Sequence, residues 1–245
     1  MPDTPPRTSA SPRRVWGMFD RIAPRYDMLN HVLSFRRDIA WRKRTASHLA
    51  EASDQVVLDL ATGTADLLIA LHETGRVKQG VGMDMSSGML VHGKRKIEEL
   101  GMTAALALRE GDATEIPEPD AVYDAVSIAF GIRNVGKTEE ALREMLRVLK
   151  PGGRALILEF SIPSNPIVRF GYLVYLRHLL PRVGGLISGD SEAYRYLNRT
   201  IELFPHGDAF LSLMRRAGFD NPIADPVTFG VASIYRGEKP HGSSP

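Results

Sequence analysis

Five short apolar segments alternate with amphipathic, helix-forming segments through the middle of the chain, and this order constrains the fold more than any other feature. The predicted strands are residues 56–60, 77–83, 105–109, 122–129 and 155–160. Strands separated by helices pair in parallel through right-handed crossovers. Residues 56–60 form a continuous apolar run, which is typical of a strand buried on both faces. We therefore predict an α/β fold with a parallel sheet and helices on both faces.

The remaining elements complete one domain of residues 15–240. Strand patterns at residues 219–224 and 227–234 bring the predicted count to seven. Thr138 is the predicted N-cap of the helix before the fifth strand, and Pro151 its stop. Val15, Trp16, Phe19 and Ile22, followed by Trp41, Thr45 and Leu49, recur at helical spacing and predict a helical cap over residues 15–52. Residues 162–205 are predicted as a second cap insertion, and residues 1–14 and 241–245 as disordered tails.

The loop after the first predicted strand has the chemistry of a ligand site. Its sequence from Asp59 to Asp66 contains Ala61, Gly63 and Ala65, which are small enough for a ligand to approach the backbone. In α/β sheets, ligands bind at the carboxyl ends of the strands. Asp84 ends the next strand, where a carboxylate accepts hydrogen bonds from ribose hydroxyls. The sequence therefore predicts a nucleoside pocket.

Asp66 argues against a dinucleotide in that pocket. A dinucleotide fingerprint requires glycines at the positions of Ala61, Gly63 and Asp66, and only Gly63 is present. A carboxylate at a helix N-terminus repels a pyrophosphate but attracts an ammonium and a sulfonium. S-adenosylmethionine carries both cations and no phosphate. The simpler alternative is an ordinary strand–turn–helix in which Asp66 caps the helix.

Composition excludes several other classes. The 245 residues carry a formal net charge of +2, with 31 Lys and Arg against 29 Asp and Glu, which is too balanced for a strong nucleic-acid surface. The absence of cysteine excludes disulfides, thiolate zinc sites and cysteine nucleophiles. No metal site and no export signal are predicted. No membrane span is predicted either, because the most apolar stretch, residues 170–187, is interrupted by charges and Pro181. These features predict a cytoplasmic protein.

Several motifs carry a more specific resemblance. They are residues 19–27 (FDRIAPRYD), 111–113 (GDA), 130–135 (FGIRNV), 147–153 (RVLKPGG), 158–161 (LEFS), 194–197 with 204–205, and 228–230 with 235–237. Together they resemble the ubiquinone/menaquinone biosynthesis C-methyltransferase family over about residues 15–240. Ala65, where many members have glycine, favours the menaquinone branch. The resemblance implies a Rossmann-like class I methyltransferase fold with a seven-stranded, mostly parallel sheet.

The resemblance also implies a cofactor and the residues that bind it. The cofactor is S-adenosylmethionine, and Thr64 and Asp84 contact it, Asp84 through the ribose. Asp112 and Ala113 hold the adenine edge, although Asp112 taken alone is more typical of an Asx-turn. Asp59, Gly63 and Ala129 complete the predicted cofactor site.

The implied reaction transfers a methyl group to a ring carbon of demethylmenaquinol, giving menaquinol in the last step of menaquinone biosynthesis. The 2-polyprenyl-6-methoxy-1,4-benzoquinol precursor of ubiquinone is the alternative substrate; an RNA methyltransferase and a non-catalytic scaffold are more distant ones. Arg133 and Asn134 follow the fourth strand and are the predicted catalytic pair, with Arg133 stabilising a phenolate. The alternative for this pair is a surface salt bridge beside a turn asparagine. Tyr26, His31, Tyr196 and His206 are weaker candidates.

The second cap insertion has two interpretations that the sequence leaves open. Its apolar residues cover the core, or they form a groove for a polyprenyl tail; they are Phe170, Tyr172, Leu173, Tyr175, Leu176, Leu179 and Leu180. The insertion is also predicted to meet the inner face of the membrane peripherally, through Leu176 and Leu180. A polyprenylated quinol is the predicted partner, nucleic acid is not, and a homodimer is left open.

Overall fold

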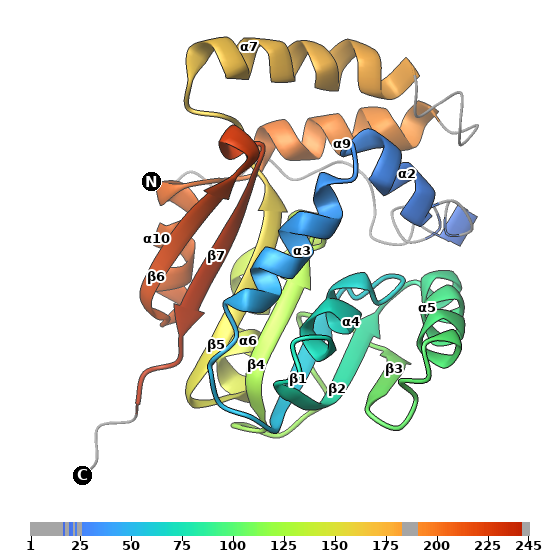
Figure 1. Cartoon of the computed structure of the whole chain (residues 1–245). Helices are drawn as coiled ribbons and strands as arrows, with labels where there is room; N and C mark the ends of the chain where they lie inside the picture. The colour runs from blue at the N-terminus through green and yellow to red at the C-terminus, as the bar shows by residue number, and fades with distance from the viewer. Residues whose placement is uncertain (1–16, 18–19, 22, 24–25, 183–190, 242–245) are drawn as a thin grey trace.

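The centre of the molecule is a seven-stranded sheet (Figure 1). The computed structural model describes residues 17, 20, 21, 23, 26–182 and 191–241. The strands lie in the order β3-β2-β1-β4-β5-β7-β6, and only the pairings of β7 are antiparallel. Their bounds are β1 Gln55–Leu60, β2 Val77–Asp84, β3 Leu106–Glu110, β4 Tyr123–Ala129, β5 Leu149–Phe160, β6 Asp220–Val227 and β7 Ala232–Glu238. The prediction of a seven-stranded, mostly parallel sheet is confirmed.

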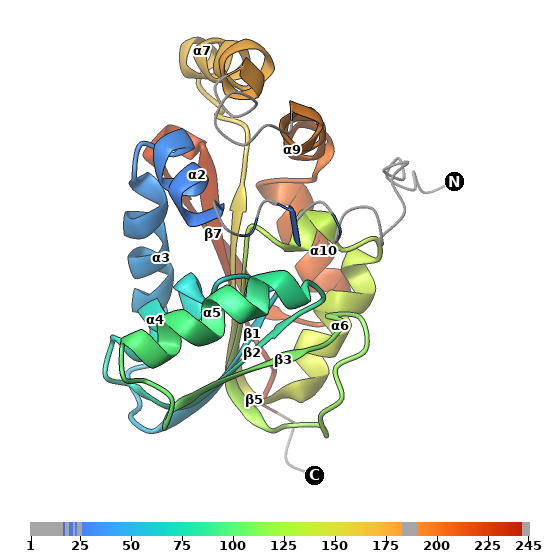
Figure 2. The same cartoon turned by 90° about the vertical axis from the view of Figure 1, so that its right-hand side faces the viewer.

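Helices cover both faces of this sheet (Figure 2). On one face lie α3 Arg37–Ser47, α4 Asp66–His72 and α5 Ser87–Glu99; on the other lie α6 Thr138–Val148 and α10 Asp208–Ala217. Each layer buries its own apolar cluster against the strands, since the sheet is apolar on both faces. The predicted helix face is buried: Trp41 and Thr45 on α3 are 4% and 0% exposed, and Leu49, just after the end of α3, is 1% exposed.

A third group of helices lies over the carboxyl ends of the parallel strands (Figure 1). It comprises α2 Tyr26–Leu33, α7 Pro166–Val174 with its π-helical continuation η3 Tyr175–Leu179, and α9 Ser191–Leu203. Asn165 caps α7 by accepting hydrogen bonds from Ile167 N and Val168 N, and Pro166 occupies its first position. Residues 15–16, 19 and 22 of the predicted N-terminal helix lie outside the described residues.

Two predicted boundaries are wrong. Thr138 is the first residue of α6, not its N-cap, and the helix ends at Val148. β5 therefore begins at Leu149 and takes Pro151, Gly152 and Gly153 into a bulge, at which the pairing register with β4 shifts. The C-terminal strands also differ, because residues 228–230 form a turn with positive φ angles between β6 and β7. β6 is an edge strand, where proline is tolerated because half of the backbone groups face away from the sheet.

Candidate active site

A cavity of about 440 Å³ opens where the strand order reverses, between β1 and β4. This switch point is where open α/β sheets bind ligands, because the two loops diverge there and leave a crevice. Residues from the carboxyl ends of four strands line it. They include Ala61 and Gly63 after β1, Asp84 at the end of β2, Gly111 to Thr114 after β3, and Ala129 to Gly131 at the end of β4. Gly63, Asp84, Asp112, Ala113 and Ala129, all predicted to bind the cofactor, meet here.

The β1–α4 loop approaches the cavity in an unusual backbone conformation. Ala61, Gly63 and Ala65 have φ angles of 46°, 56° and 67°. Left-handed alanines are strained by about 1–2 kcal/mol each, so tertiary contacts must hold them. One such contact is the close packing of Ala61 against Gly131, where a Cβ on Gly131 would lie only 2.5 Å from the Cβ of Ala61. The small residues therefore let the loops after β1 and β4 pack closely beside the cavity.

Asp84 is fixed at the floor of the cavity by backbone groups. Its Oδ2 accepts a hydrogen bond from Gly63 N at 2.8 Å, and its Oδ1 accepts one from Ser86 N at 2.8 Å. Burial raises the pKa of this carboxyl above its usual value, and the backbone N–H donors oppose that rise. The carboxylate is thus held in one orientation and retains acceptor capacity for further donors.

Asp112 and Ala113 line the same cavity one strand further along. Asp112 Oδ1 accepts hydrogen bonds from Thr114 N and Thr114 Oγ1, each at 2.8 Å. This is the Asx-turn that the sequence offered as the alternative to a binding role for Asp112. The turn and the binding role are compatible, because the turn uses one carboxylate oxygen and orients the other.

Asp59 and Thr64 do not line this cavity. Both lie on a separate void of about 20 Å³ beneath the β1–α4 loop. Asp59 accepts hydrogen bonds from Thr62 Oγ1 at 2.6 Å and Ser127 Oγ at 2.5 Å, and burial raises its pKa to about 7. The Thr64 hydroxyl donates to Asp27 at 2.5 Å. The two side chains therefore support the loop from below instead of facing the larger space.

Asp66 has a different setting from the one predicted. Its Oδ1 lies 2.6 Å from Lys96 Nζ and its Oδ2 lies 3.5 Å from Arg42 Nη2. These contacts belong to a chain of alternating charges that links four helices. The chain runs through Asp27, Lys96, Asp66, Arg42 and Asp38, and His31 contacts its last member, Asp38. Because protein cations already neutralise Asp66, its main role is to tie α2 and α3 to α4 and α5.

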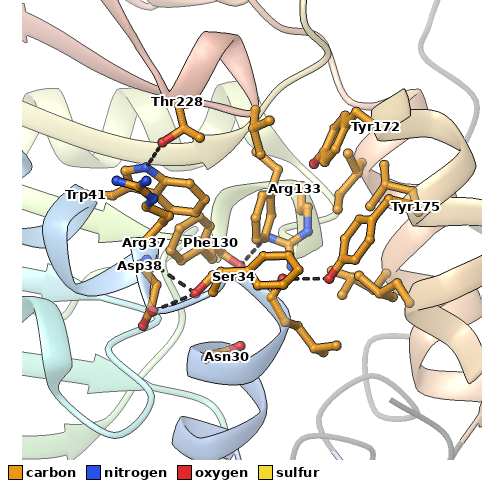
Figure 3. A pocket seen from close by; sticks show the side chains of 18 of the residues that line it. Asn30, Ser34, Arg37, Asp38, Trp41, Phe130, Arg133, Tyr172, Tyr175 and Thr228 are labelled. Atoms are coloured by element: carbon orange, nitrogen blue, oxygen red, sulfur yellow. Dashed lines mark hydrogen bonds between the residues drawn. The ribbon is translucent and has the colours of Figure 1, made fainter. Parts of the chain in front are cut away.

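A second, larger cavity of about 570 Å³ adjoins the first (Figure 3). Tyr26, Phe130 and Asn134 line both. Its wall is mostly apolar and aromatic and comes from α2, α3, the end of β5 and the insertion, including Leu33, Phe35, Trp41, Phe160, Val168, Tyr172, Tyr175, Leu176, Leu180 and Leu197. Leu176 and Leu180 of the insertion are buried and also line this cavity, so the insertion covers the body of the molecule and borders an apolar space. Its use as a groove for a polyprenyl tail stays a prediction.

Arg133 enters this second cavity as part of a buried ion pair. Its Nη1 lies 2.7 Å from Glu159 Oε1, and the two side chains are 6% and 0% exposed. The same Nη1 donates to Phe130 O at 2.5 Å, and the guanidinium lies 5.3 Å from the centroid of the Phe160 ring. The surface salt bridge that was the alternative for this residue is therefore wrong.

Asn134 and the tyrosines border the junction of the cavities. Tyr196 donates from its hydroxyl to Asn134 Oδ1 at 3.3 Å. Burial raises the pKa of Tyr26 and of Tyr196, which keeps both hydroxyls protonated at neutral pH. His31 contacts Asp38 at 2.9 Å, and His206 contacts the carbonyl of Phe204 at 3.3 Å. Neither histidine lines a described cavity.

Two site residues were missed by sequence reasoning. Glu159 is the second-to-last residue of β5 and follows the buried apolar run 155–158, and that position was a signal, because a carboxylate there needs a buried partner. Asp38 lines the second cavity; burial raises its pKa, but hydrogen bonds from Ser34 and Arg42 lower it overall. No local pattern marked Asp38. Across the described residues, no cluster of three or more His, Asp or Glu side chains suits a metal ion.

The fold places the chain in a class of proteins. It is the Rossmann-like fold of class I S-adenosylmethionine-dependent methyltransferases. A solved S-adenosylmethionine-dependent methyltransferase from Thermotoga maritima, described as a possible histamine N-methyltransferase, matches with a TM-score of 0.65 at 17% identity, covering 92% of this chain and 99% of that one. At that identity the likeness establishes the fold alone.

Sequence comparison is more specific. The ubiE/COQ5 methyltransferase family matches residues 7–239. The chain is 45% identical over 223 residues to a demethylmenaquinone methyltransferase of Thermus thermophilus, covering 91% of this chain and all of that one. It is 44% identical over 220 residues to a ubiquinone/menaquinone biosynthesis C-methyltransferase of Syntrophotalea carbinolica, covering 90% and 92%. The chain belongs to the ubiE/COQ5 methyltransferase family and is a methyltransferase.

Proposed function

We propose that the protein transfers a methyl group from S-adenosylmethionine to a ring carbon of demethylmenaquinol, producing menaquinol. The observation that carries this proposal is the pair of adjoining cavities. One is lined by carboxylates at the switch point and the other is apolar and aromatic, and Tyr26, Phe130 and Asn134 line both. A small polar donor and a large apolar acceptor can therefore meet there. The names of the relatives support the quinol as acceptor.

The residues of the first cavity fit S-adenosylmethionine. Asp84 and Asp112 suit the hydroxyls of a ribose and the amino group of an adenine, and two carboxylates disfavour a pyrophosphate. Gly63, Ala113 and Ala129 offer close backbone approach. Asp59 and Thr64 contribute through the loop that they support. When bound, S-adenosylmethionine supplies an electrophilic methyl group on a sulfonium.

The second cavity accounts for the preference for a reduced ring. A quinol carbon becomes strongly nucleophilic when the neighbouring hydroxyl loses its proton, whereas the oxidised quinone has no such carbon. Arg133 stabilises the phenolate by donating a hydrogen bond from its unpaired Nε, and its pair with Glu159 holds the guanidinium in place for that contact. Asn134, fixed by Tyr196, orients the hydroxyl or a water molecule beside it. Alignment of the two reactants supplies much of the remaining rate enhancement.

Methyl-labelled S-adenosylmethionine tests the function directly. The purified protein is incubated in separate reactions with demethylmenaquinol and with the 2-polyprenyl-6-methoxy-1,4-benzoquinol, under a reductant, and label is counted in the lipid extract. We expect label in the naphthoquinol, and none when the same ring is supplied oxidised. Label confined to the benzoquinol would move the protein to ubiquinone biosynthesis. Label in neither quinol would refute the proposal.

We also propose that the mouth of the second cavity rests on a lipid surface. Phe35 lines the cavity yet is 75% exposed, and on α7 Ile167 and Phe170 are 83% and 73% exposed. The exposed Arg36 and Arg169 flank them, as suits an anionic headgroup layer. Leu176 and Leu180, predicted to meet the membrane, are at most 4% exposed and cannot do so. Across the described residues, no helix has the length and apolar character to span a bilayer.

Flotation with anionic phospholipid vesicles tests this contact. The double variant Ile167→Asp, Phe170→Asp should lose most vesicle binding, because it places two charges in the interface. Val91→Asp is the matched control, since Val91 is 65% exposed on α5, on a face of the sheet and not over the strand ends. Equal binding by the double variant and the control would refute the proposal.

A further inference from the structure

The second cavity contains polar atoms that the protein itself does not satisfy. Among the described residues, three side chains that line it have a buried polar atom without a hydrogen-bond partner: Asn30 Nδ2, Arg133 Nε and the hydroxyl of Tyr172. Leaving a buried polar group unpaired costs about 1–3 kcal/mol. In a cavity shaped for a ligand, such atoms indicate where polar atoms of that ligand bind.

Tyr172 is the least expected of the three. Tyr26, Tyr172 and Tyr196 all lie close enough to Arg133 for its positive charge to lower their pKa values, against the rise that burial causes. Asn30 lies close enough to Tyr26 to lower the pKa of that hydroxyl, and Tyr196 donates from its hydroxyl to Asn134 Oδ1. Of these three tyrosines, only Tyr172 has a hydroxyl without a protein partner.

The neighbouring tyrosine shows that the insertion can satisfy a phenol. Tyr175, one helical turn further along, donates from its hydroxyl to Leu33 O at 2.6 Å and so joins the insertion to α2. Figure 3 shows Tyr172 and Tyr175 on the same side of the pocket, with the hydroxyl end of Tyr172 toward Arg133. Burial raises the pKa of Tyr172, so its hydroxyl stays protonated and can donate a hydrogen bond.

The geometry of a quinol supplies an acceptor for this donor. In a 1,4-quinol the two oxygens lie on opposite edges of the ring. In both candidate substrates one oxygen is beside the carbon that receives the methyl group and the other is beside the prenyl tail. Arg133 and Asn134 can serve one edge only, so the opposite edge needs a separate donor. We propose that Tyr172 donates a hydrogen bond to the ring oxygen beside the tail, and thereby fixes which ring carbon faces the cofactor cavity.

This inference rests on the proposed function, and a pair of substrates tests it. The first is a short-tailed demethylmenaquinol. The second is the matching naphthol, which keeps the hydroxyl beside the acceptor carbon and has hydrogen in place of the oxygen beside the tail. Tyr172→Phe should raise the KM for the quinol about tenfold, equivalent to about 1.4 kcal/mol. It should leave the KM for the naphthol unchanged, because that ligand has no atom for Tyr172 to bind.

Tyr175→Phe is the matched control, since it removes the hydroxyl of the adjacent tyrosine whose partner is protein. Whatever it costs, the cost should be the same factor for both substrates. The proposed hydrogen bond would be refuted if Tyr172→Phe also raised the KM for both substrates by the same factor, because the hydroxyl would then contribute to packing only. It would also be refuted if Tyr172→Phe left the KM for the quinol unchanged, because the hydroxyl would then not bind the ring.

A binding measurement separates this inference from the proposed function. Trp41 lines the cavity, so quenching of its fluorescence reports the binding of an oxidised short-tailed naphthoquinone without any methyl transfer. Tyr172→Phe should weaken that binding about tenfold as well, because a quinone carbonyl also accepts a hydrogen bond. Weakened quinone binding without turnover of any quinol would refute the function and keep the subsite. Turnover with unchanged quinone binding would refute the subsite and keep the function.

Discussion

The buried pair of Arg133 and Glu159 permits a quantitative prediction for Glu159→Gln. Glu159 Oε1 accepts from Arg133 Nη1 at 2.7 Å and from Phe160 N at 2.8 Å, while Oε2 accepts from Arg133 N at 3.3 Å. Glutamine keeps an oxygen for the first two donors but turns an NH₂ toward the third. The substitution removes the negative charge that strengthens these hydrogen bonds, and it places the glutamine NH₂ against the backbone N–H of Arg133. It also leaves the buried guanidinium without its counter-charge. Together these effects should cost about 3 kcal/mol of unfolding free energy.

Urea denaturation at neutral pH measures this loss, provided that the dependence on urea stays the same. Glu139→Gln is the matched control, because Glu139 forms an exposed pair with Arg216, and it should cost less than about 1 kcal/mol. The double variant Arg133→Met, Glu159→Gln should lose about 2 kcal/mol less unfolding free energy than the two single variants lose together, since no uncompensated charge remains.

A small effect of Glu159→Gln would refute this reasoning. Burial raises the pKa of Glu159 above its usual value, although Arg133 opposes that rise. If the rise passed neutral pH, Glu159 would be protonated in the folded protein, and glutamine would replace it at little cost. A loss below about 1 kcal/mol, or additivity in the double variant, would therefore exclude the ion pair.

Three further predictions concern the first cavity and its supports. Asp59 has a pKa of about 7 in the folded protein, so the native state keeps a proton that the unfolded chain loses, and the free energy of unfolding falls as pH rises from about 4 to 7. Asp59→Asn should gain up to about 4 kcal/mol of unfolding free energy relative to the parent across that range, and a difference independent of pH in urea titrations would contradict this. Lys96→Met leaves Asp27 and Asp66 without their shared cation, and should cost about 2 kcal/mol of unfolding free energy; an unchanged urea midpoint would show that the chain of charges does not hold α2. Asp84→Asn should weaken S-adenosylmethionine binding at least about tenfold by calorimetry with the circular dichroism spectrum retained, and undiminished affinity would remove Asp84 from the site.

The sequence was sufficient for features that depend on local periodicity. Continuous apolar runs separated by amphipathic helices predicted the five parallel strands, and the placement of Asp84 at a strand end predicted its position at the switch point. Burial of a strand on both faces leaves a pattern that neighbouring residues carry by themselves. The errors were at boundaries, such as the start of β5, where a bulge paired with β4 replaces a turn.

Only the tertiary structure decided which side chains face one another. Asp59 and Thr64 belong to the predicted loop, yet they line a separate small void, because the chain between them turns through left-handed residues at Ala61 and Gly63. Arg133 and Glu159 are 26 residues apart, and their pairing arises because β4 and β5 are neighbours in the sheet. The second cavity exists only because α2 and the insertion meet over the strand ends. Charge pairing and cavity shape depend on distances between segments far apart in the chain, which no local pattern records.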